Sequence, residues 1–434
     1  MRGMVRLAST LLNDRDQEQT EHLPFVAAAH DTLLTAIETL PAPSCIALYG
    51  AWGAGKSTLL RHAYRSYGAT HGGRALWFDP WEYERRADVV SPLLHALVSH
   101  ARTNQSRGDL AWQIARNIAR VLASLALRTG GKQLLDIELE PDKLRQQFDE
   151  WSRYHDEIAT LKSDFARLIR LVLDDESDKA PFVFFLDDLD RCLPDSVLAV
   201  LEGVKLLLCG DPSCRASFVF ALDRQVVGDS IAQRYSVASS YSGETYLEKI
   251  FDLSLEVPPL ANGTAAGMLQ SQWSAADIVE IGRRLEPIGG SAALAQVLEN
   301  PAFANPRVIK RVVNRLILLF RDAGVAAWSS TLSHSDQTRF LCWVAGAERF
   351  RSFRYKFMSA TGDELAQLAA AIKGGGAFQV SPELNRAVNL PDFRGYFTLL
   401  GLTHLNASGF DDERNPSSSG SLRRFDDVLR SAGL

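Results

Sequence analysis

The sequence predicts an α/β fold with a five-stranded, mainly parallel sheet in a three-layer α/β/α arrangement. Short apolar runs recur at strand length, helical patterns separate them, and polar or glycine-rich residues follow several runs directly. Strands that alternate with helices are typical of parallel sheets, because parallel neighbours need crossover connections. The five expected strands are residues 45–49, 74–78, 182–186, 216–222 and 251–257.

The loop after the first expected strand carries a phosphate-binding pattern. Residues 50–57 read G-A-W-G-A-G-K-S, a complete G-x-x-x-x-G-K-[ST] sequence, and residues 58–64 read as the first turns of a helix. The backbone N–H groups of such a loop, with the positive end of the helix dipole, form a cradle for phosphates. Lys56 would reach the β- and γ-phosphates, and the Ser57 hydroxyl would ligate Mg²⁺. We expect the nucleotide-binding residues to be Gly50, Ala51, Trp52, Gly53, Ala54, Gly55, Lys56, Ser57 and Thr58.

A chance match in a glycine-containing turn is the alternative interpretation, and a second motif argues against it. Residues 182–186 read F-V-F-F-L, a strand buried on both faces, and D-D-L-D-R follows directly at 187–191. Open α/β sheets hold their ligands at the carboxyl ends of their strands. Asp187 is therefore expected to hold Mg²⁺, usually through water, and Asp188 to orient or deprotonate the attacking water. The competing reading is an Asp-Asp turn that only ends a strand.

Two further residues are candidates for sensing the nucleotide. The strand at 216–222 ends at Asp223, which would point at the γ-phosphate if this strand lies between the two motif strands. Arg307 follows Asn305-Pro306 at the start of a helix, where its guanidinium could reach back to the nucleotide; Pro306 suits the first helical turn. Three cations farther along this helix fit either a functional face or a solvated, lid-packing face: Lys310, Arg311 and Arg315.

The order of the elements indicates the type of nucleotide. One extra strand stands between the phosphate loop and the acidic strand, which is typical of the P-loop branch that activates water with a carboxylate. No N-K-x-D sequence follows an expected strand to recognise guanine, so ATP with Mg²⁺ is favoured. An arginine finger from a neighbouring subunit is plausible, and its candidates are Arg191, Arg224 and Arg234.

Changes in polarity divide the chain into four parts. Residues 1–22 form a polar segment, 23–260 the P-loop core, 261–325 a helical lid, and 326–434 a C-terminal helical region with loops at 374–376 and 415–420. Residues 89–174 form a helical insertion in the core, in two blocks around the turn at 129–131. Apolar residues recur in both blocks at helical spacing, which favours helix packing over a membrane-surface helix; they include Ile118, Leu122, Leu125, Leu161, Phe165 and Leu168.

Composition limits the compartment and the partners. The 434-residue chain carries a formal net charge of −5, with a pI near 6.0. These values provide no global attraction to nucleic acid, which is an unlikely partner, although a local basic face is compatible with them. Five scattered cysteines fit reduced thiols in a cytoplasm. The sequence shows no signal-peptide core. It also shows no apolar run long enough to cross a membrane, because the best candidate for such a run, residues 111–127, carries Arg116 and Arg120.

Together these motifs resemble the KAP family of P-loop NTPases over roughly residues 23–320. The resemblance rests on the phosphate loop, the acidic strand end, and further segments at 77–84, 220–224, 246–251 and 305–307. It implies a core similar to AAA+ and related signalling ATPases, with ATP, Mg²⁺, a helical lid and self-association. It also implies involvement in phage exclusion or membrane-linked signalling.

This sequence departs from the family pattern at two points. Family members commonly insert membrane helices between the two motifs, whereas residues 89–174 look soluble, so membrane association is left open without a membrane-spanning helix. The family residue corresponding to Asp79 is often asparagine, which leaves the role of Asp79 open. We expect an ATP-hydrolysing switch that forms a homo-oligomer or binds a partner protein. The alternatives are a nucleotide-gated scaffold with little turnover and a nucleic-acid-stimulated motor.

Overall fold

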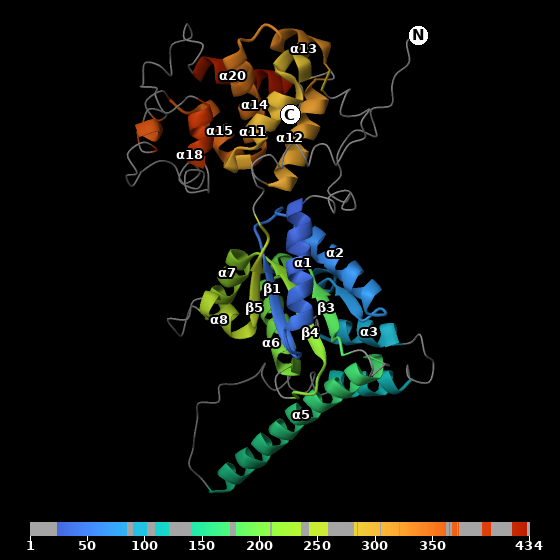
Figure 1. Ribbon diagram of the computed structural model, residues 1–434. Coiled ribbons are helices and arrows are strands. Elements are labelled where there is room, and N and C mark those ends of the chain that lie inside the picture. The colour runs from blue at the N-terminus through green and yellow to red at the C-terminus, as the bar shows by residue number, and fades with distance from the viewer. Residues whose placement is uncertain are drawn as a thin grey trace. The chain divides into compact units, whose positions relative to one another are not determined.

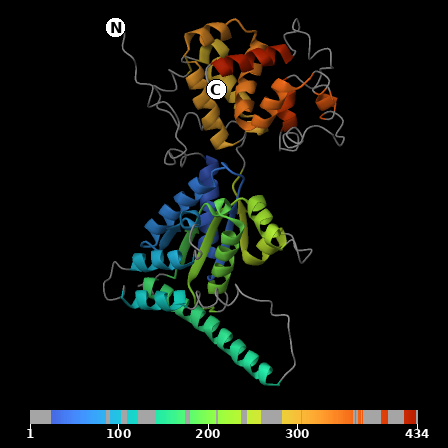
Figure 2. The ribbon, with the colours of Figure 1, turned by 180° about the vertical axis from the view of Figure 1, so that it is seen from behind.

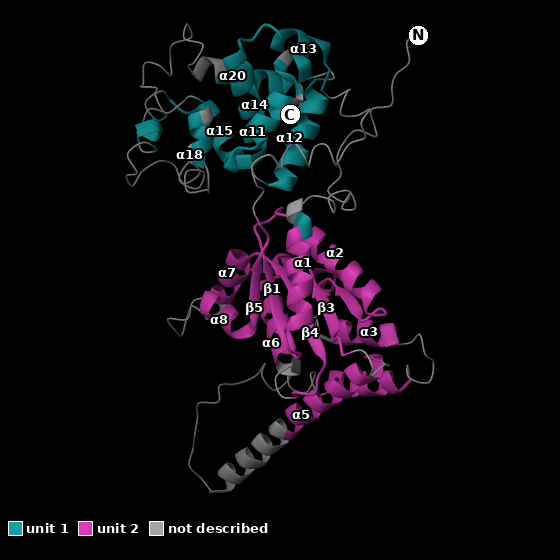
Figure 3. Ribbon diagram, viewed as in Figure 1, with its two compact units in different colours: residues 1–27, 259–434 teal, residues 28–258 magenta. Residues whose placement is uncertain are grey.

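The computed structural model divides the chain into two compact units, which are described separately (Figure 3). One comprises residues 28–258 and the other residues 1–27 and 259–434. The structure describes residues 24–84, 90–101, 109–120, 141–173, 179–208, 211–235, 243–258, 282–283, 285–303, 305–320, 322–361, 364, 367–370, 372, 393–400 and 419–431.

The unit of residues 28–258, here called the sheet unit, is built on five parallel strands in the order β2-β3-β4-β1-β5 (Figure 1). The expected five-stranded α/β sheet is therefore confirmed, and β4 lies between the two strands that carry the motifs. β2 and β5 are shorter than the sequence pattern suggested; both lie at the ends of the sheet, where a strand has a hydrogen-bonding neighbour on one side only. The strands are β1 (Ser44–Tyr49), β2 (Ala75–Phe78), β3 (Phe182–Leu186), β4 (Ala216–Leu222) and β5 (Leu253–Glu256).

Helices cover both faces of this sheet, which gives the expected three layers. α1 (Pro24–Thr39) and α2 (Lys56–Thr70) cover one face (Figure 1). The view from behind shows the other face covered by further helices (Figure 2). These are α3 (Val90–Ala101), α5 (Pro141–Leu173) and α6 (Pro194–Leu208), with α7 (Arg224–Tyr235) and α8 (Gly243–Ile250) continuing beyond α6.

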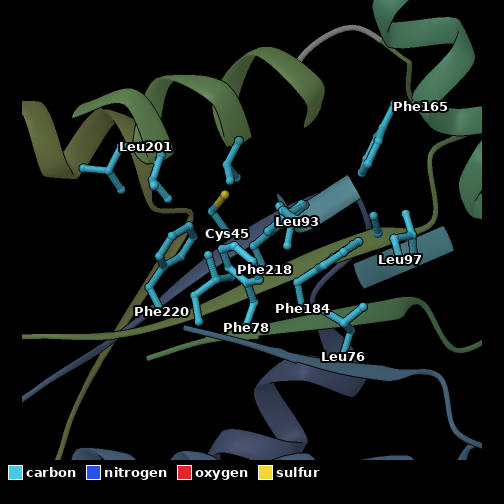
Figure 4. Close-up of a cluster of buried hydrophobic side chains, with 14 of the residues drawn as sticks. Cys45, Leu76, Phe78, Leu93, Leu97, Phe165, Phe184, Leu201, Phe218 and Phe220 are labelled. Atoms are coloured by element: carbon cyan, nitrogen blue, oxygen red, sulfur yellow. The ribbon is translucent and has the colours of Figure 1, made fainter. Parts of the chain in front are cut away.

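Aromatic side chains fill the core between the sheet and α3, α5 and α6 (Figure 4). Phe184 and Phe218 lie on adjacent strands and stack with their ring centroids 4.4 Å apart. Phe165 of α5 packs against both rings. The next residue of β3, Phe185, points to the opposite face and meets Tyr64 of α2. This alternation buries β3 on both faces, as its continuous apolar run predicted.

The insertion contains three described helical stretches: α3, residues 109–120 and α5. Four residues of its predicted apolar stripes are buried, namely Ile118, Leu161, Phe165 and Leu168. Ile158 and Val172, which continue the stripe of α5, are partly buried. Leu122, Leu125 and the expected turn at 129–131 lie outside the described residues. Within the part of the chain that the structure describes, no helix combines the length and the apolar character needed to cross a membrane.

The other unit, here called the helical unit, packs around α14 (His334–Arg349). A single core cluster joins side chains from the expected lid to side chains from the expected C-terminal region, so both ranges share one unit. The loop expected at 374–376 lies outside the described residues, and the final helix already begins at Ser419, within the loop expected at 415–420. The other elements are η5 (Glu286–Ile288), α11 (Gly290–Leu298), η6 (Pro301–Phe303), α12 (Pro306–Leu319), α13 (Ala323–Ser329), α15 (Arg351–Ser359), α18 (Phe393–Leu399) and α20 (Ser419–Ser431).

Candidate nucleotide-binding site

The phosphate loop connects the end of β1 to the first residue of α2. Gly53 and Gly55 adopt φ angles of 86° and 102°, a conformation that glycine reaches without the steric cost other residues meet. Gly50 is needed for a different reason. A Cβ atom there would lie 3.2 Å from Cγ of Lys56 and 3.3 Å from Cβ of Val257. The glycines therefore allow a tight path from strand to helix, and α2 begins at Lys56 without a side-chain cap.

Lys56 is buried and its ammonium group lies against the loop. Nζ donates to the carbonyl oxygens of Gly50 (2.8 Å) and Ala51 (3.4 Å). It also pairs with Asp190 at 3.2 Å. The Asp190 carboxylate in turn accepts a hydrogen bond from the backbone N–H of Asp223 (3.0 Å). Asp190 thus fixes the lysine and ties the end of β3 to the end of β4, a function that the motif alone did not reveal.

Ser57 and Asp187 meet although 130 residues separate them. The Ser57 hydroxyl donates to Oδ1 of Asp187 at 3.0 Å. Asp187 is only 3% exposed. The pKa of its carboxyl is raised to about 6, first by burial and then by the nearby charge of Asp188. A hydroxyl beside a buried carboxylate supplies the hard oxygen ligands that Mg²⁺ prefers.

Asp188 lies next to Asp187 in a left-handed conformation, with a φ of 56°. Its carboxylate pairs with Arg191 at 2.8 Å, and the Arg191 guanidinium lies 5.2 Å from the centre of the Trp81 ring. Arg191, considered above as a finger for another subunit, therefore contacts the acidic motif of its own chain.

Asp79 adds a third carboxyl group to this edge. Its side chain caps η3 (Pro80–Tyr83) by accepting from the backbone N–H of Trp81 at 3.0 Å. The pKa of Asp79 is raised to about 6, first by burial and then by the charge of Asp188. Asp79, Asp187 and Asp188 therefore form an acidic edge in which each charge disfavours the others. Sequence reasoning noted Asp79 but gave it no role.

The other predicted residues have separate surroundings. Oδ1 of Asp223 accepts from the N–H groups of Gln225 (3.1 Å) and Val226 (3.4 Å), so it caps α7. Arg307 stands in the first turn of α12, in the helical unit, where Asn305 caps the helix. The roles of Asp223 and Arg307 as sensors stay predictions.

The remaining finger candidates and the loop tip can also be located. Arg224 pairs with Glu244 (3.5 Å) and Glu248 (3.7 Å) on α8. The side chain of Arg234 lies outside the described residues. Trp52, at the tip of the phosphate loop, is 71% exposed.

This arrangement fits a nucleotide bound with Mg²⁺. The loop and Lys56 would hold the phosphates, and Ser57 with Asp187 would hold the metal. Among the described side chains, no group of three or more His, Cys, Asp or Glu residues could form a closed metal site. Such a protein-only cage is not required, because Mg²⁺ commonly binds one or two carboxylates together with substrate phosphates.

Known proteins provide three comparisons. Two matching solved structures are of the ORC2 protein of Aeropyrum pernix, in ADPNP–ADP complexes and in an ADP form. The first is 13% identical to the chain, and the match covers 97% of this chain and 95% of the other, with a TM-score of 0.33. The second is 14% identical, and the match covers 94% of this chain and 93% of the other, with a TM-score of 0.34. No curated protein matches the chain.

The family comparison covers most of the chain. Residues 27–321 match the family model described as the KAP family P-loop domain. This range includes the phosphate loop, the acidic edge and the first turn of α12. The chain belongs to the KAP family of P-loop NTPases.

Proposed function

We propose that this protein binds ATP with Mg²⁺ and hydrolyses it, and that the nucleotide switches its conformation. The observation that carries the proposal is the contact between Ser57 and Asp187 next to the buried Lys56. A lysine for phosphates and two oxygen ligands for a divalent cation converge there from the start of α2 and the end of β3. When bound, Mg²⁺ would neutralise phosphate charge and align the phosphates.

Asp188 is the proposed base in this reaction. Its carboxylate oxygen would accept a proton from, or orient, the attacking water. In this structure that carboxylate pairs with Arg191 at 2.8 Å. Arg191 would have to release Asp188 before the carboxylate can receive a proton, and this exchange of partners is a natural point of control. Asp223 and Arg307 are proposed to sense the γ-phosphate.

The pairing of Asp188 with Arg191 also favours a second candidate function. If the pair persists when ATP is bound, the protein would bind nucleotide and hydrolyse it very slowly. The chain would then act as a nucleotide-gated scaffold that assembles with copies of itself or with another protein. The two candidates share the nucleotide site and differ only in turnover.

Two substitutions test the site. Lys56→Ala is expected to weaken ATP binding by at least about 100-fold, which corresponds to about 2.8 kcal/mol. Lys249→Ala, an exposed lysine of α8 in the same unit, serves as the matched control. Asp188→Asn is expected to slow hydrolysis by about 100- to 10,000-fold, the usual range for a general base, while ATP still binds. Hydrolysis at the parental rate in Asp188→Asn would remove Asp188 from the mechanism.

Phosphate release measured at increasing protein concentration separates the two candidates. A specific activity that rises with concentration would indicate a site completed between subunits. Size-exclusion chromatography with and without ATP reports assembly in the same samples. Assembly driven by ATP with almost no phosphate release would favour the scaffold, whereas fast turnover by a monomer would count against it.

Family membership supports a wider biological proposal, a role in phage defence or membrane-linked signalling. We place this activity in the cytoplasm, with peripheral membrane contact as a further proposal. Plaque formation on cells that express the chain or its Lys56→Ala variant tests the first role. Equal plating on both cell lines across a phage panel would argue against defence that depends on the nucleotide.

A further inference from the structure

A cavity whose lining includes no residue of the phosphate loop lies in the unit of residues 28–258. It has a volume of about 480 Å³ and is formed by η3, α3 and the helix at residues 109–120. This volume is in the range of small-molecule sites. We call it the insertion pocket, and the residues that matter to the argument are Tyr83, Leu94, His95, Trp112, Ala115 and Arg116.

The walls of the insertion pocket are mainly apolar, and its polar groups are cationic or neutral. Trp112 is 42% exposed and meets His95 edge-on, with ring centroids 6.2 Å apart. A large exposed indole beside a cavity is a common feature of binding surfaces. Arg116 follows Trp112 by one helical turn and brings a guanidinium group to the same helix face. No carboxylate is among the described lining residues.

We propose that the insertion pocket binds a small molecule with an apolar, preferably aromatic, body and one acidic group. Trp112 and the aliphatic wall would cover the body. Arg116 would pair with the acidic group at the rim, where a guanidinium matches the geometry of a carboxylate or sulfonate. Charge complementarity therefore selects an anion over a neutral or cationic molecule of the same shape.

The pocket is connected to the acidic edge through η3. Tyr83 lines the pocket, and its ring stacks on Phe78 with centroids 5.3 Å apart and an interplanar angle of 5°. The same short turn begins at the Asp79 cap and carries Trp81, on which Arg191 rests.

A second contact joins the same two segments. Glu84 follows η3 directly and accepts a hydrogen bond from the backbone N–H of Leu193, next to the acidic motif. A ligand that moves or fixes Tyr83 would therefore act on Asp79 and on the Arg191–Asp188 pair. This regulatory part of the proposal rests on the proposed ATPase function, whereas binding to the pocket does not.

Binding is tested by calorimetry on the full chain without nucleotide, with 2-naphthoate and its neutral amide, 2-naphthamide, as probes. Arg116→Gln is expected to weaken 2-naphthoate binding by about tenfold, or about 1.4 kcal/mol, and to leave 2-naphthamide unchanged. Arg120→Gln, one turn along the same helix and absent from the pocket lining, should change neither. Equal effects of the two arginine variants would overturn the assignment of Arg116.

A variant that fills the cavity tests the location. Ala119 also lines the pocket and is only partly buried, so Ala119→Phe can place a ring inside it. It is expected to abolish binding of both probes while circular dichroism stays unchanged. Should the variant misfold, Arg116→Gln still decides the question. The absence of saturable heat with either probe, or binding only at a new interface between copies, would overturn the proposal.

Amide hydrogen exchange tests the connection through η3 between the insertion pocket and the acidic edge. This measurement does not depend on ATP hydrolysis. Saturating 2-naphthoate is expected to slow exchange at residues 79–84 and 187–193. It should also change the rate of phosphate release by at least about twofold, the smallest change that such an assay separates reliably. Tyr83→Leu should remove both effects and Tyr83→Phe should keep them. Slowed exchange in a protein that shows no ATPase activity would refute only the proposed function. Unchanged exchange while 2-naphthoate is bound would refute the connection between the insertion pocket and the acidic edge.

Discussion

Asp187 of the sheet unit and Asp426 of the helical unit are both almost completely buried, but their surroundings differ. Asp426 is 0% exposed and is bound by two guanidinium groups, those of Arg354 and Arg430. Asp187 is 3% exposed, and among the described residues no lysine, arginine or histidine pairs with it. Its recorded partners are the Ser57 hydroxyl and the backbone N–H of Asp188.

This difference separates a carboxylate that holds the fold together from one that is suited to a ligand. A buried carboxylate is costly unless a cation or several hydrogen bonds compensate it. Asp426 receives that compensation within the chain. Asp187 does not, and its pKa is raised to about 6, mainly by burial. A divalent cation would supply what Asp187 lacks, which is the physical argument for placing Mg²⁺ there.

The largest expected effect concerns Asp426. Asp426→Asn should lower the stability of the helical unit by about 3–5 kcal/mol, because it removes the charge that compensates the buried Arg354 guanidinium. Hydrogen exchange followed by mass spectrometry can resolve α14 and α20 from the sheet. The neighbouring exposed Asp427 provides the control, since Asp427→Asn should change stability by less than about 0.5 kcal/mol. A small effect of Asp426→Asn would mean that Asp426 does not hold the fold together, and the contrast with Asp187 would fail.

The corresponding substitution at Asp187 should raise stability, whereas that at Asp426 should lower it. Asp187→Asn removes an uncompensated buried charge and should stabilise the nucleotide-free sheet unit at pH 7 by about 1–3 kcal/mol. It should also abolish the Mg²⁺ dependence of nucleotide binding. Urea unfolding and titration with a fluorescent ATP analogue measure the two effects, with Asp229→Asn, exposed on α7, as control. A loss of stability equal to that of Asp426→Asn would show that Asp187 is structural.

The contribution of Asp187 to the stability of the folded state should change with pH in a defined direction. The pKa of Asp187 is about 6 in the folded chain, whereas an aspartate side chain ordinarily has a pKa near 3.8, so the folded state binds the proton more tightly. Stability therefore falls as pH rises from about 4 to about 6. Urea midpoints of the parent and of Asp187→Asn should coincide near pH 4 and diverge up to pH 6. A difference between the two urea midpoints that stays constant from pH 4 to pH 6 would show that the raised pKa of Asp187 is not the cause.

Local motifs and topology predicted which side chains meet around Asp187. The glycine pattern and the acidic run led to the candidates Lys56, Ser57, Asp187 and Asp188, whose roles stay predictions. The rule that parallel strands end at one edge of the sheet predicted that Ser57 and Asp187 come together across 130 residues. The contact between Ser57 and Asp187 could be predicted because it follows from short motifs and from topology, not from the details of packing.

The missed contacts depend on packing. Asp190 was part of the acidic run, but only the folded chain shows that it holds Lys56 and the backbone of Asp223. The pair between Asp188 and Arg191 has the spacing of one turn and could have been considered from the sequence. Arg354 and Asp426 are 72 residues apart, and neither belongs to a motif, so the sequence contains no signal that joins them.

The smallest expected effect divides the stabilisation of Asp426 between its two partners. Arg430 pairs with Asp426 at 2.8 Å from one turn away on the same helix, but its side chain is 57% exposed. Water screens such a pair, so Arg430→Ala should cost less than about 1 kcal/mol in the helical unit. Arg354→Ala should cost several times more, because that side chain is only 11% exposed. Similar losses in the two variants, measured by exchange at α20, would show that Asp426 depends equally on the exposed and the buried arginine.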